Sequence, residues 1–157
     1  MNNGYHIHEA NPFYVQALAE RRALHAAAER LRKFTADGST AKGTKTQITE
    51  LRRCIVELCN HLARHIAEES AGGCLEEASA RNPKIAAEAE TLQLQYCDFL
   101  KAAEQLRFNA ERPNLTADAW NALRSDCSRL AGRLREYEAG ESALLQNAFN
   151  EAPEFEF

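Results

Sequence analysis

Two pairs of polar side chains in this chain have a spacing that could do chemistry. His65 precedes Glu69 by four residues, and Tyr137 precedes Glu141 by the same interval. Side chains four residues apart lie on one face of a helix, so each pair would hold a carboxylate beside an imidazole or a phenol. Such groups can bind a metal ion, form an ion pair or share a proton.

Each pair interrupts a heptad pattern that is otherwise apolar and typical of helices facing a bundle core. The members of the two seams are Ile48, Leu51, Ile55, Leu58, Leu62, His65 and Glu69, and Trp120, Leu123, Cys127, Leu130, Leu134, Tyr137, Glu141, Leu144 and Ala148. Burying an unpaired carboxylate is costly. Glu69 and Glu141 must therefore share a cation, share a proton or pair with a group such as His65 or Arg21.

Two further stretches carry polar residues that we expect at the same level. Tyr96 lies on an apolar face after the turn at Asn82. Its distance from that turn along the sequence is about the same as that of His65 and Glu69, which precede the turn. At the rise of an α-helix, such residues stand side by side in a hairpin. His25 lies on, or at the edge of, the best apolar face of the first stretch.

Prolines, N-cap residues and a loop at 37–44 divide the chain into periodic stretches. The predicted helices are 12–35, 45–80, 83–110 and 117–150. Gly72 and Gly73 indicate a kink or a close approach of helices. Short connections favour antiparallel neighbours, so we predict an all-α fold, an antiparallel up-down-up-down four-helix bundle. The predicted parts of the chain are an N-terminal tail at 1–11, the bundle at 12–150 and a C-terminal tail at 151–157.

The order and placement of these motifs resemble the hemerythrin-like (HHE cation-binding) family. The stretch 62–73 is similar to the second helix of bacterial members. The segments around Tyr96 and Tyr137 resemble the third and fourth helices of the family, with tyrosine where the family has histidine. The first-helix ligand maps to His25, and the resemblance covers residues 12–150.

This resemblance implies non-haem iron, commonly an oxo- or carboxylate-bridged pair capped by histidines, in a protein that carries or senses oxygen or handles iron. Carried over residue by residue, it implies the metal ligands His25, His65, Glu69, Glu141, Tyr96 and Tyr137. A further histidine often expected in the family is replaced by Leu100. We therefore expect a protein that is not an enzyme, with an altered and incomplete iron site used for metal binding or sensing.

A metal-free bundle is the alternative interpretation. Tyr96 and Tyr137 would fill the space left by metal and imidazoles and would donate hydrogen bonds to Glu69 and Glu141. The polar residues would then hold the core in register. In that case the chain is a structural or partner-binding protein, and both a protein partner and a homo-oligomer stay open.

Composition narrows the functional classes. The 157 residues are 45% hydrophobic, which is enough for one domain with a real core. A net charge of −4 argues against a nucleic-acid partner. The sequence shows neither an apolar run that would span a membrane nor an apolar signal segment. The five cysteines are odd in number and lack a C-x-x-C pair, which favours a reducing cytoplasm.

Overall fold

A computed structural model of the chain describes residues 12–36 and 43–150, with the backbone alone at 12–18 and 150. The two predicted tails and most of the predicted loop lie outside these residues. The elements in chain order are α2 (Pro12–Thr35), α3 (Lys45–Ser70), α4 (Cys74–Arg81), the 3-10 turn η1 (Pro83–Ile85), α5 (Ala86–Ala110) and α6 (Ala117–Asn150). The described part contains helices and no strand, so the predicted all-α class is confirmed.

One predicted helix is wrong in extent, because the stretch 45–80 is two helices, α3 and α4. Gly72 has a φ of 89°, a left-handed conformation that side chains rarely adopt. A Cβ on Gly73 would lie 2.9 Å from both the carbonyl oxygen of Glu68 and the Cα of Glu69. The glycine pair therefore permits both the turn and the close approach, and it ends α3 at Ser70.

Local signals fix the helix starts. Thr44 and Gln47 form the predicted capping box, in which the Gln47 N–H donates to Thr44 Oγ1 at 3.1 Å and the Thr44 N–H donates to Gln47 Oε1 at 3.0 Å. The Ala119 N–H donates to Thr116 Oγ1 at 3.1 Å, which caps α6. Asn82 caps the 3-10 turn through the Lys84 N–H.

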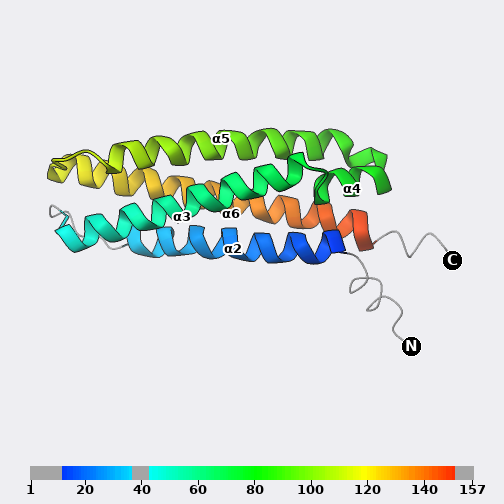
Figure 1. Ribbon diagram of the computed structural model, residues 1–157, viewed down its shortest axis with the longest axis horizontal. Coiled ribbons are helices and arrows are strands. Elements are labelled where there is room, and N and C mark those ends of the chain that lie inside the picture. The colour runs from blue at the N-terminus through cyan, green and yellow to red at the C-terminus, as the bar shows by residue number, and fades with distance from the viewer. Residues whose placement is uncertain (1–11, 37–42, 151–157) are drawn as a thin grey trace, which may run out of the picture.

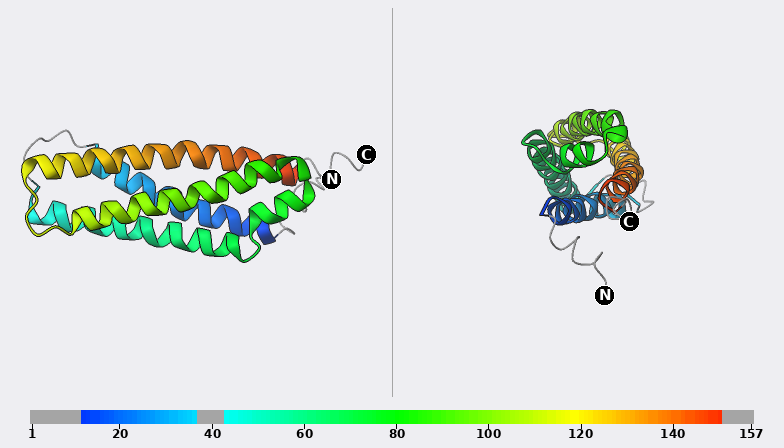
Figure 2. Two further views of the ribbon diagram at one scale, coloured as in Figure 1. Left: turned by 90° about the horizontal axis from the view of Figure 1, so that it is seen from above. Right: turned by 90° about the vertical axis from the view of Figure 1, so that its right-hand side faces the viewer.

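The four long helices lie side by side, and α4 covers one end of them (Figure 1). Each of α2 and α5 packs against both α3 and α6, so the four enclose one interior, as the end-on view of Figure 2 shows. The short helix α4 packs against α5, α6 and α2 at the end where α3 passes to α5. None of the helices in the described ranges is long and apolar enough to cross a membrane.

The interior holds two apolar clusters. The larger runs along the long helices and includes Leu31, Leu58, Trp120 and Leu134. The smaller lies beneath α4 and includes Leu75, Ile85 and Leu145. The polar seam residues fall between these clusters along α3 and α6, as the heptad pattern predicted.

Candidate functional site

A layer of buried polar side chains separates the two apolar clusters. We call it the polar layer, and its members are His65 and Glu69 from α3, Tyr96 from α5 and Glu141 from α6. Their exposed fractions are 2%, 6%, 1% and 1%. Burial on this scale requires each polar atom to find a partner inside the protein.

The centre of the polar layer is a contact among Tyr96, Glu141 and His65. The Tyr96 hydroxyl donates a hydrogen bond to Glu141 Oε2. The His65 ring packs on the Tyr96 ring with centroids 4.4 Å apart, and His65 Nε2 lies 3.8 Å from Glu141 Oε1. That distance is too long for a hydrogen bond, and Nε2 has no other hydrogen-bond partner. On its other side, His65 Nδ1 lies 3.3 Å from Glu20 Oε2 of α2.

Glu69 has a separate partner, the start of α4. Its Oε2 accepts the Leu75 N–H at 3.0 Å. The free N–H groups at a helix start favour a carboxylate there. Burial raises the pKa of Glu69, while the Leu75 N–H and then His65 act in the opposite direction. A Cβ at Gly73 would lie 2.9 Å from Glu69 Oε2, so the glycine break also leaves room for this carboxylate.

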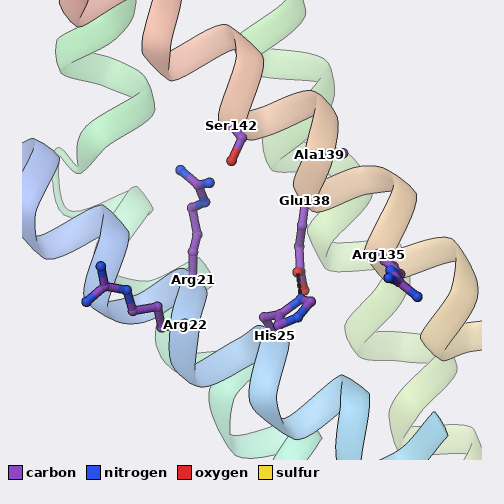
Figure 3. Close-up of a pocket in the computed structure, with 7 residues that line it drawn as sticks. All are labelled: Arg21, Arg22, His25, Arg135, Glu138, Ala139 and Ser142. Carbon is purple, nitrogen blue, oxygen red and sulfur yellow. Dashed lines mark hydrogen bonds and ion pairs between the residues drawn. The ribbon is translucent and has the colours of Figure 1, made fainter.

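The other two predicted ligands lie apart from this centre. His25 is half exposed on α2, and its Nδ1 lies 3.0 Å from Oε2 of Glu138 (Figure 3). The Tyr137 hydroxyl donates to the Thr91 carbonyl at 3.4 Å, and its ring meets the Tyr96 ring edge-on at 5.3 Å. The interpretation in which both tyrosines donate to carboxylates is therefore right for Tyr96 and wrong for Tyr137.

Glu138 is a buried carboxylate that the heptad analysis missed. Its residue is 7% exposed, and burial raises its pKa although the hydrogen bond from His25 lowers it. Glu138 lies four residues after Leu134 and three before Glu141. A core stripe drawn one position wider than the strict seam would have included it, because a core-facing helix buries more than two positions per heptad.

The predicted ligands do not form a ready-made metal centre in the described part of the chain. Across the described ranges, no group of three or more His, Cys, Asp or Glu side chains is placed to hold a metal ion. Each predicted glutamate ligand already accepts a hydrogen bond, Glu69 from Leu75 and Glu141 from Tyr96. The arrangement fits a hydrogen-bonded network better than a paired-iron centre, and iron binding stays a prediction.

The polar layer has one side that opens toward solvent. A pocket of about 210 Å³ between α3 and α5 is bordered by His65, Glu69 and Tyr96, with Gln93, Leu94 and Cys97 at its α5 side.

Comparisons with known proteins neither support nor oppose the family resemblance. Neither the family models, nor the curated proteins, nor the solved structures that were searched include a match to this chain. The hemerythrin-like resemblance therefore rests on the sequence motifs and their placement alone.

Proposed function

We propose that the chain is a hemerythrin-like, antiparallel up-down-up-down bundle whose polar layer is a hydrogen-bonded network instead of an iron centre. It would act as a structural or partner-binding protein and catalyse no reaction. The observation that carries this proposal is the hydrogen bond from Tyr96 to Glu141, at a position where the resemblance would place a histidine ligand.

The chemistry of a buried phenol supports the network. Burial, and then the neighbouring Glu141, hold the pKa of Tyr96 far above its usual range. The phenol therefore keeps its proton and serves as a donor, whereas ligation to ferric iron would need the phenolate. Tyr96 and Glu141 thus satisfy each other inside an apolar core.

The partner of Glu69 supports the same proposal. This carboxylate holds the first turn of α4 against the end of α3 through Leu75. Its role is then to fix the short helix over the smaller apolar cluster. The predicted reducing, cytoplasmic location belongs to the same proposal, and it agrees with five cysteines that are all free.

A single metal ion is the second candidate, and one observation favours it. His65 Nε2 is buried without a hydrogen-bond partner, and it faces Glu141 Oε1 across 3.8 Å. A cation between these two atoms would satisfy both, with Tyr96 as the third group within reach. His65, Glu141 and Tyr96 would hold it, and it would supply a positive charge that offsets the buried carboxylate.

Thermal unfolding with and without metal ions separates the two candidates. The network predicts one melting temperature in chelator, in Fe²⁺ and in Zn²⁺. A metal site predicts a rise, since a ligand at about 100 times its Kd stabilises a protein by about 2.7 kcal/mol. The variant His65→Gln would abolish that rise, whereas His61→Gln, one turn earlier on α3, would keep it. A rise that depends on His65 would contradict the network.

A further inference from the structure

A second pocket, outside the polar layer, lies between α2 and α6 (Figure 3). We call it the outer pocket, and its volume is about 440 Å³, within the usual range for small-molecule sites. The polar side chains that line it are Arg21, Arg22, His25, Arg135, Glu138 and Ser142. Of these residues, the resemblance uses His25 alone, and the proposed function uses none.

The charges of the outer pocket are opposite to those of the whole chain. The protein has a net charge of −4, yet three guanidinium groups surround this pocket against one carboxylate. That carboxylate, Glu138, is held by His25 at 3.0 Å. The pocket is therefore a local region of positive potential on an acidic protein, which favours anions.

Two of the three cations, Arg21 and Arg22, form no ion pair in the described part of the chain, although the charge of Arg21 acts to lower the pKa of Glu138. Arg21 Nε is buried and makes no hydrogen bond, and Arg22 is exposed with no ion pair among these residues. Other arginines of the bundle are paired, as Arg30 is with Glu57 at 2.9 Å and Arg81 is with Glu77 at 3.2 Å. The Nε donor of Arg21 thus has no partner in the described part of the fold.

The geometry of Arg21 suits an anionic ligand. Figure 3 shows its side chain extending from α2 into the space between α2 and α6, and Ser142 lines the same pocket from α6. A guanidinium presents parallel donors that match a carboxylate or a phosphate, and a serine hydroxyl can add a further donor. Arg22 and Arg135 lie at the rim in Figure 3, where their charge would attract an anion without contacting it directly.

We propose that the outer pocket binds a small organic anion that carries a carboxylate or a phosphate group. Arg21 binds the anionic group through its guanidinium, and Ser142 donates to the same group. The apolar stems of the arginines and the methyl group of Ala139 contact the remainder of the ligand. This site goes beyond the proposed function, because it involves none of the polar layer.

Calorimetric titration of the full chain tests the site, with inorganic phosphate and succinate as the two probes in a low-salt buffer that contains neither. We expect saturable binding of at least one probe, and the tighter probe identifies phosphate or carboxylate as the preferred group. Arg21→Gln should weaken that binding by about tenfold or more, the effect of one charge-assisted hydrogen bond.

Arg129→Gln is the matched control, because it removes one charge from an exposed position on α6 outside the pocket. It should change affinity by less than about twofold. Ser142→Ala gives a second reading if Arg21→Gln proves poorly folded, and it should also weaken binding. Absence of saturable binding for both probes would overturn the proposal, as would equal losses in Arg21→Gln and Arg129→Gln. Anion binding in the outer pocket does not depend on whether the polar layer holds a metal ion. The titration therefore tests the outer pocket separately from the proposed network.

Discussion

The polar layer and the outer pocket lie on adjoining faces of α6. They differ in how their charged side chains are paired. Glu141 faces Tyr96 and His65 in the interior, whereas Glu138, three residues earlier, faces His25 on α2. In the polar layer, Glu69 and Glu141 accept hydrogen bonds from donors of the protein itself. Outside, Arg21 keeps a buried Nε that the fold does not satisfy.

This difference indicates which polar groups of a helical bundle are paired within the fold and which are left for a ligand. In the polar layer the carboxylates need donors from the protein itself, because an unmet buried group costs about 1–3 kcal/mol. In the outer pocket three guanidinium groups stand against one carboxylate, so part of the positive charge is left for a ligand. Each region keeps one buried nitrogen without a partner among the described residues, His65 Nε2 in the layer and Arg21 Nε in the pocket, but only the pocket has more cations than carboxylates.

The largest expected effect on stability comes from alkaline pH, which tests whether the buried cysteine thiols are shielded from water. Burial raises the pKa of Cys59, Cys74 and Cys127 from 9.0 to about 12. Above pH 9 the unfolded chain loses these protons first, so stability falls as pH rises from about 9 to 12. The fall is up to about 1.4 kcal/mol per pH unit for each thiol.

Urea unfolding at a series of pH values measures this slope. Cys127→Ala lowers absolute stability through its cavity, but it should also reduce the slope by about one proton. A free energy of unfolding that stays level between about pH 9 and 11 would show that water reaches these thiols.

The next largest effect comes from the two tyrosines, whose rings meet edge to face but whose hydroxyl groups have different partners. Tyr96→Phe leaves Glu141 without its donor in the core, so we expect a loss of about 2 kcal/mol. Tyr137→Phe removes only a long hydrogen bond to Thr91 near the surface, and it should cost less than about 0.5 kcal/mol. Chemical denaturation of both variants gives the comparison. Equal losses would mean that the polar layer is not held by Tyr96.

A comparable effect is expected at the helix break. Gly73→Ala forces a Cβ against the backbone of α3 and against Glu69, so it should cost about 1–3 kcal/mol. The control is Gly132→Ala on α6, where a Cβ meets nothing within 4 Å. It should stabilise the protein by about 0.5–1 kcal/mol through helix propensity. If both variants gain stability, the close approach of α4 to Glu69 is not a constraint on the fold.

The smallest effect on stability is expected in the outer pocket. Arg21 makes no hydrogen bond through Nε and no ion pair within the described residues, so Arg21→Gln should change the free energy of unfolding by less than about 0.5 kcal/mol. The same denaturation assay measures it. A loss above about 1 kcal/mol would show that Arg21 supports the fold, and its role would then be structural.

The sequence predicted much of the fold because the heptad seams are nearly unbroken. Seam positions such as Leu58 and Leu134 are buried, and α2 and α6 have their predicted bounds. The break at Gly72 and Gly73 was predicted only as a kink or close approach. A glycine pair permits a left-handed turn, but it does not by itself require one.

The candidate site was less predictable. The seams placed His65, Glu69, Tyr96 and Glu141 in the interior, since burial follows from periodicity. Which donor meets which acceptor depends on distances between helices that periodicity does not specify. The contact of Glu69 with α4 and the outer pocket at Arg21 both come from this packing.

Elemental analysis tests the central claim most directly, that the carboxylates of the polar layer are satisfied without a metal ion. The untagged chain would be expressed in iron-supplemented medium, purified without chelator and measured for metal content. We predict less than about a tenth of a metal ion per chain, because a tightly held ion would need ligands that are preformed and free. One or two irons per chain, lost in Glu141→Gln and kept in Glu138→Gln, would contradict the account and establish an iron site in the polar layer.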